Sequence, residues 1–134
     1  MDIHLPQVAV ASMNATHEEE LALLRELAAL LADPDAAPED LEKAIAAFRD
    51  HVETHFSREE KLMETYGFPP YPIHRAEHDR MRRLVTELCY GWRTEAGRAA
   101  LQRFVTQEFP DWLTQHVETM DFVTAQFLAM HGVE

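Results

Sequence analysis

Histidine and carboxylate residues recur in four separate segments of this chain, at spacings that place them together on a helix. His55 and Glu59 are four residues apart, and so are His74 and His78. Residues four apart lie one above the other on a helix, so each pair presents two potential ligands to the same side. A four-helix bundle can point such pairs into one buried cavity. The pattern therefore predicts a helical bundle built around a metal site.

Apolar residues repeat at helical spacing in four stretches, which segments rich in proline and glycine separate. Pro34 and Pro38 bound the first break, and Gly67 opens a second break that holds three prolines. We expect Pro110 to kink the last helix, or to start it afresh near Phe109. The predicted helices cover about residues 15–32, 39–66, 73–92 and 94–130.

Four helices with short connections predict an all-α fold, an up-and-down antiparallel four-helix bundle. We expect a single domain over residues 1–134 with a short N-terminal arm over residues 1–14, because 134 residues suffice to bury one core. Asn14 or Thr16 is expected to cap the first helix. The acidic residues 18–20 should then lie in its first turn, where negative charge is favourable.

The charge balance is strongly acidic. Asp plus Glu number 24 against 12 Lys plus Arg, which gives a formal net charge of −12. Nucleic acids and anionic lipid surfaces both require a basic footprint, so we expect neither nucleic acid nor a membrane as a partner. No run of about 18 apolar residues could cross a bilayer, and the N-terminal segment does not resemble a signal peptide. We therefore expect a cytoplasmic protein.

His116 and Asp121 pose a geometric problem because they are five residues apart. On a regular α-helix this spacing separates the two side chains by about 140°. A local widening of the helix, a π-bulge, would bring them to one face, and such bulges are frequent at functional sites. Regular i to i+4 hydrogen bonding from Val117 to Phe122 would exclude this route.

A competing interpretation treats the histidines as unrelated surface or core residues. It must place five of them on four separate helices by coincidence: His17, His55, His74, His78 and His116. His4 in the arm and His131 at the tail are expected to be bystanders. His51 lies one turn before His55, which leaves open a ligand role or a supporting role, and we favour a position outside the ligand set.

The assembled residues resemble the hemerythrin family, specifically its bacterial single-domain members. The resemblance covers nearly the whole chain in the family's order, and it includes the five-residue step in the last motif. The stretches that carry it are His17-Glu18-Glu19-Glu20-Leu21, His55-Phe56-Ser57-Arg58-Glu59-Glu60, His74-Arg75-Ala76-Glu77-His78, and Trp112 through His116 to Asp121.

The resemblance implies two iron ions with an oxo or hydroxo bridge. The implied ligands are His74, His78 and His116 for one iron, His17 and His55 for the other, and Glu59 and Asp121 as bridges. This set leaves one position open on the iron that has two histidines, and the resemblance places dioxygen there. Phe56, Leu113 and Val117 are expected to wall that position with apolar side chains, a role compatible with plain bundle core.

The function that the resemblance implies is that of a non-enzymatic, non-haem di-iron protein that reversibly binds dioxygen for storage, delivery or sensing. Five neutral imidazoles beside two carboxylates carry less negative charge than carboxylate-rich di-iron sites, which favours reversible binding over oxygenation. A di-iron redox enzyme acting on peroxide or nitric oxide is the alternative, and a structural or zinc-binding bundle is a third. The choice of iron over zinc or manganese rests on the resemblance, because the ligand types alone suit several metals.

Overall fold

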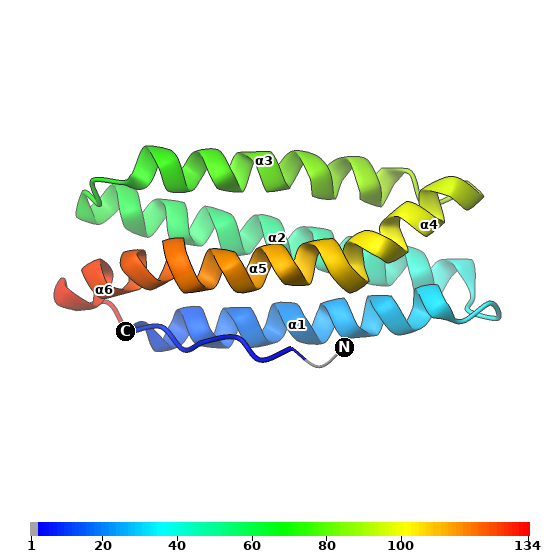
Figure 1. The fold of residues 1–134 in the computed structure, drawn as a ribbon, viewed down its shortest axis with the longest axis horizontal. Coiled ribbons are helices and arrows are strands. Elements are labelled where there is room, and N and C mark those ends of the chain that lie inside the picture. Colours follow the sequence, from blue (N-terminus) through cyan, green and yellow to red (C-terminus); the bar gives the residue numbers. More distant parts are fainter. Residues whose placement is uncertain (1–2) are drawn as a thin grey trace.

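A computed structural model describes residues 3–134 as four long helices that run alternately up and down and pack side by side (Figure 1). Residues 1–2 of the predicted arm lie outside the described residues. The first three helices are α1 (Ala11–Ala32), α2 (Pro38–Tyr66) and α3 (Tyr71–Tyr90). The fourth is continuous and consists of α4 (Glu95–Arg103), η1 (Phe104–Glu108), α5 (Phe109–His116), η2 (Val117–Asp121) and α6 (Phe122–Met130). The predicted all-α four-helix bundle is confirmed.

The start of α1 differs from the prediction. The helix begins at Ala11, before the predicted start at residue 15, and no side chain caps it. Asn14 instead ties down the arm: its Nδ2 donates to the Val8 carbonyl at 2.9 Å, and the Val8 N–H donates to its Oδ1 at 2.8 Å. The Thr16 hydroxyl donates back into its own helix. The acidic residues 18–20 therefore lie beyond the first turn of α1. The predicted cap was wrong because the Asn14 side chain bonds to the arm and the Thr16 hydroxyl bonds within the helix.

The breaks between helices follow the proline and glycine signals closely. Gly67 ends α2 in the left-handed region, with φ +68°, a conformation that glycine adopts without steric cost. Pro72 lies in the first turn of α3, where its missing N–H costs no helical hydrogen bond, so the helix begins at Tyr71 and not at residue 73. It ends at Tyr90, two residues before the predicted end, and Gly91 follows as its C-cap.

The last helix accommodates Pro110 without breaking. Immediately before the proline, the helix widens into the π-helical segment η1, where the Phe109 N–H donates to the Phe104 carbonyl five residues earlier. Pro110 then occupies the first turn of α5. Because proline lacks an N–H and crowds the preceding turn, widening of the helix there relieves the conflict. The helix therefore does not start afresh near Phe109; the π-segment η1 occupies the place where a kink or a fresh start was expected.

One apolar core fills the space between the helices. Phe48 meets Phe109 edge-to-face with ring centroids 5.0 Å apart, and Phe104 packs on Phe109 at 5.7 Å. Each fully buried leucine or phenylalanine contributes about 1.5–3 kcal/mol to folding. The described part of the arm runs along α1 (Figure 1) and buries Leu5, Val8 and Val10. None of the described helices is both long and apolar enough to span a membrane.

Candidate metal centre

Seven histidine and carboxylate side chains from all four long helices meet in the interior, and each is at most 3% exposed. They are His17 from α1, His55 and Glu59 from α2, His74 and His78 from α3, and His116 and Asp121 from the last helix. Their ligand atoms form two groups, each with all of its atoms within 4.8 Å of one another. The three-histidine group holds His74, His78 and His116, the two-histidine group holds His17 and His55, and Glu59 and Asp121 belong to both.

Glu59 faces the two groups with different oxygens. Its Oε1 lies 3.5 Å from Nε2 of His74 and 3.4 Å from Nε2 of His78. Its Oε2 lies 2.8 Å from Nε2 of His55 and 3.9 Å from Nε2 of His17. One carboxylate therefore lies between the groups and can serve a cation on each side.

Asp121 repeats this arrangement from the opposite helix. Its Oδ1 lies 3.1 Å from Nε2 of His74 and 3.2 Å from Nε2 of His116, whereas its Oδ2 lies 3.1 Å from Nε2 of His17. The widened segment η2 brings Asp121 to this place. There the Phe122 N–H donates to the Val117 carbonyl five residues earlier. The predicted π-bulge is confirmed.

Apart from Nε2 of His55 and Oε2 of Glu59, which lie 2.8 Å apart, most of the clustered atoms do not satisfy one another by hydrogen bonding. Both ring nitrogens of His17 and both carboxylate oxygens of Asp121 are buried without a hydrogen-bond partner, as are Oε1 of Glu59 and Nε2 of His78. Nε2 of His74 lies 3.1 Å from Nε2 of His116. When neither of these nitrogens carries a proton, both are acceptors and neither satisfies the other. Buried polar atoms are normally partnered. Five imidazoles and two carboxylates around such orphaned atoms fit bound transition-metal cations.

Both central carboxylates remain ionised despite their burial. Burial alone would raise the pKa of Asp121, but His116, His17 and His74 hold it well below its usual range. Burial and the Asp121 charge raise the pKa of Glu59, but hydrogen bonds and charge from His55, together with His78, lower it to about 2. The cluster therefore presents two negative charges to any cation that enters.

Three of the five imidazoles are anchored through the ring nitrogen that faces away from the cluster. The pairs are His55 Nδ1 with Glu20 Oε1 at 3.0 Å, His74 Nδ1 with Thr124 Oγ1 at 2.8 Å, and His78 Nδ1 with Glu60 Oε2 at 2.8 Å. Such partners fix which nitrogen is free to bind a metal. Sequence reasoning missed all three partners. No spacing in the sequence marks Glu60 as a partner of His78, and Glu20 was assigned to the first turn of the first helix.

Aromatic rings hold the three-histidine group from outside. The Phe56 ring stacks on His78 with centroids 4.1 Å apart and planes 4° apart. The Trp112 ring stacks on His116 at 4.5 Å, and its Nε1–H donates to Glu77 Oε1 at 2.8 Å. These flat contacts restrict rotation of both imidazoles.

The other histidines take no place in the cluster. His51 contacts two carboxylates of α1, with Nδ1 3.1 Å from Glu20 Oε1 and Nε2 3.3 Å from Glu19 Oε2. His131 lies at the chain end with its Nδ1 2.9 Å from the Phe127 carbonyl. His4 also lies outside both groups. The expectation that His51 lies outside the ligand set agrees with this geometry.

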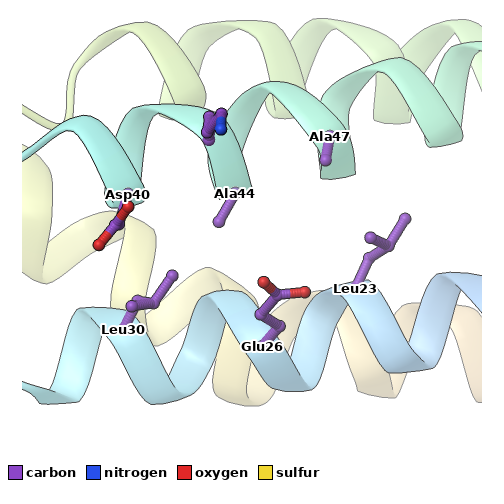
Figure 2. Close-up of a pocket in the computed structure, with 7 residues that line it drawn as sticks. Leu23, Glu26, Leu30, Asp40, Ala44 and Ala47 are labelled. Atoms are coloured by element: carbon purple, nitrogen blue, oxygen red, sulfur yellow. The ribbon is translucent and has the colours of Figure 1, made fainter.

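Cavities occur beside the cluster and far from its residues. A cavity of about 10 Å³, roughly the size of one water, adjoins His55 and Glu59 and is otherwise lined by Ser12, Met13, Thr16, Arg58 and Leu62. A much larger one of about 510 Å³ lies between α1 and α2, where Leu23, Glu26 and Leu30 face Asp40 and two alanines (Figure 2). No clustered residue lines this larger cavity, so it does not adjoin the metal centre.

Comparisons with known proteins agree with this geometry. The family model described as Hemerythrin HHE cation binding domain matches residues 8–128. The chain belongs to the hemerythrin family. Bacteriohemerythrin of Aquifex aeolicus (strain VF5) is 38% identical over 116 residues, 87% of each chain. Bacteriohemerythrin of Ralstonia nicotianae (strain ATCC BAA-1114 / GMI1000) is 37% identical over 122 residues, which cover 91% of this chain and 83% of that one. A crystal structure of wild-type hemerythrin matches with a TM-score of 0.76 at 26% identity, over 90% of both chains.

The shared position of Asp121 predicts unequal effects of two substitutions on metal stoichiometry. Asp121→Ala should weaken the binding of both metal ions, because one oxygen of Asp121 faces each group. His17→Ala should weaken the binding of only the ion in the two-histidine group, and should leave about one metal ion per chain. Metal titration followed by elemental analysis measures both. A full single occupancy in Asp121→Ala, or equal loss of both metals in His17→Ala, would contradict the shared arrangement.

Metal affinity should rise with pH through the neutral range. Burial alone would lower the pKa of His55 and of His78, but Glu20 and Glu59 raise the first well above its usual value, and Glu59 and Glu60 raise the second. Metal must therefore displace protons from these rings at neutral pH, whereas the carboxylates are already ionised. Competition titrations from about pH 5 to about pH 8, with an indicator of proton release, test this. A pH-independent affinity would show that the imidazoles are not ligands.

Proposed function

We propose that this chain is a non-haem di-iron protein that binds dioxygen reversibly for storage, delivery or sensing, and that it is not an enzyme. The observation that supports this most strongly is the orientation of Glu59 and Asp121, each with one oxygen toward three histidines and the other toward two. Carboxylates that serve two cations at once are the natural centre of a dinuclear site in a helical bundle. Membership of the hemerythrin family supports iron as the metal.

In this proposal the two groups hold one iron each, and Glu59 and Asp121 bridge them beside an oxo or hydroxo bridge. The three-histidine group binds through His74, His78 and His116, and the two-histidine group through His17 and His55. The iron pair, when bound, supplies the electrons that dioxygen accepts on binding and returns on release. Because the two-histidine group offers one nitrogen fewer, the open position belongs on that side.

The chain's own contribution beyond the ligands is an apolar wall of buried side chains. Phe56, Leu113 and Val117 are each 0% exposed, and we assign them to the apolar wall of the open position. Excluding water lowers the local dielectric and denies protons access to the bound gas. Protection of this kind favours release of dioxygen unchanged.

The surface charge supports a limited set of partners. A formal net charge of −12 disfavours docking to nucleic acid or to anionic membranes. We assign dioxygen as the ligand and the cytoplasm as the compartment.

Visible spectra of the iron-loaded, reduced protein test the function directly. A ligand-to-iron charge-transfer band should appear in air and disappear after deoxygenation. Direct and irreversible conversion to a diferric spectrum would contradict reversible binding and favour a redox enzyme acting on peroxide or nitric oxide. His78→Ala provides the control, because removal of this ring nitrogen should lower the iron content and abolish the band.

Leu113→Ala should accelerate autoxidation of the oxygenated protein, because truncation opens the wall to water. The same change should lower the free energy of unfolding by about 2–5 kcal/mol, as for other buried leucines. Leu101→Ala is a matched control, since Leu101 is equally buried in α4 and is not one of the proposed wall residues. It should lose similar stability without faster autoxidation. Equal autoxidation rates in the two variants would remove Leu113 from the wall.

A further inference from the structure

Glu20 is a fully buried carboxylate that belongs to neither metal-ligand group. It extends from α1 at 0% exposure, and its Oε1 lies 3.0 Å from Nδ1 of His55 and 3.1 Å from Nδ1 of His51. Its Oε2 has no hydrogen-bond partner. Among the described ion pairs, none joins Glu20 to a lysine or an arginine. Two imidazoles therefore hold this anion in the interior by themselves.

Such a group is expensive to bury. An ionised carboxylate without a cationic partner costs several kcal/mol in a protein interior, and a leucine-like side chain at this core-facing position would avoid that cost. Oε1 of Glu20 lies within hydrogen-bond distance of Nδ1 of both His55 and His51, the arrangement in which a buried ionised carboxylate accepts from two imidazoles. A buried anion that is hydrogen-bonded to the outer nitrogen of a metal-facing histidine fixes the orientation of the ring and makes its other nitrogen a stronger ligand.

The corresponding carboxylate on the three-histidine group is arranged differently. Glu60 binds Nδ1 of His78 at 2.8 Å, but Arg82 donates to both of its oxygens, at 2.7 and 3.0 Å. The guanidinium is permanently charged and compensates Glu60. The two halves of the centre therefore differ in the charge behind their histidines, with a compensated carboxylate at His78 and one held only by imidazoles at His55.

We propose that Glu20 is a positioning residue that fixes Nδ1 of His55 as a hydrogen-bond donor and lowers the reduction potential of the iron in the two-histidine group. This inference rests on the di-iron centre proposed above. With its proton held at Nδ1, His55 presents Nε2 to the metal in one orientation. Negative charge on the far side of the ring makes that nitrogen a stronger donor, which stabilises ferric over ferrous iron.

His51 limits this effect, because it draws on the same carboxylate oxygen. Its ring lies between Glu20 and the exposed Glu19, and it contacts both. Removal of His51 would leave Oε1 of Glu20 to His55 alone. The effect of Glu20 on the potential should then grow, so changes at Glu20 and at His51 should move the potential in opposite directions.

The test compares Glu20→Gln with Glu60→Gln in the iron-loaded protein. Glutamine keeps the size and an acceptor oxygen but removes the charge, so Glu20→Gln should favour the ferrous state about tenfold, an upward shift of about 59 mV for one electron. Glu60→Gln makes the same chemical change at a carboxylate already compensated by Arg82, and its shift should be clearly smaller. Equal shifts in the two variants, or none in Glu20→Gln, would overturn the proposal.

Two further variants separate positioning from folding. Glu20→Leu removes the acceptor altogether and should weaken metal affinity about 10- to 100-fold at unchanged helix content. His51→Leu alters a partly exposed position, so it provides a folded protein whatever happens at Glu20, and its potential should fall. A rise or no change in His51→Leu would contradict the shared carboxylate, and full metal affinity in Glu20→Leu would contradict positioning.

Failure of this inference is distinguishable from failure of the proposed function. Reversible oxygenation of the unaltered protein, together with an unchanged potential in Glu20→Gln, would reject the role of Glu20 alone. The predicted shift in potential together with irreversible oxidation of the unaltered protein would reject reversible oxygen binding and keep the role of Glu20. Iron content and thermal unfolding, measured on the same samples, report on the centre independently of oxygen.

Discussion

The two negative charges of Glu59 and Asp121 in the bundle interior are the constraint on which the rest of the structure depends. No lysine or arginine pairs with either carboxylate among the described ion pairs, so only the surrounding imidazoles and bound cations can compensate them. Isolated buried charges are prohibitively costly. As a consequence, every long helix turns a histidine-bearing face toward one point. The up-and-down bundle is the simplest fold that supplies four such faces.

The apolar core makes this polar interior tolerable. Phe109 meets Phe48 edge-to-face and packs against Phe104 at a tilt, and leucines from α1 are completely buried in the same core. Their burial supplies stability that an orphaned polar cluster cannot. The metal centre is therefore expected to be stabilised by the fold in the absence of metal, and metal binding then adds to a bundle that is already formed.

Helical spacing made most of the fold and the pairs His55–Glu59 and His74–His78 predictable, because i and i+4 relations survive in any α-helix. The complete set of seven, with His17 in it, came from the family resemblance. The five-residue step to Asp121 was also readable, since only a π-bulge reconciles it with a shared face. The missing parts depend on contacts between distant segments. Asn14 bonds the arm instead of capping α1, and Glu20 turns inward to His55 although two other glutamates precede it. Local sequence rules do not encode either choice.

The layer behind the ligands extends the inequality between the two halves of the centre. On the three-histidine side, stacked rings hold His78 and His116, and Arg82 compensates the carboxylate behind His78. On the two-histidine side, Nδ1 of His17 has no partner, and Glu20 places negative charge behind His55. In the proposed di-iron centre, one side is thus held by stacked rings and a compensated carboxylate, whereas the other combines the proposed open position with the histidine behind which Glu20 lies. This division fits the proposal that dioxygen binds at one iron of the pair, and it lies in residues outside the ligand set.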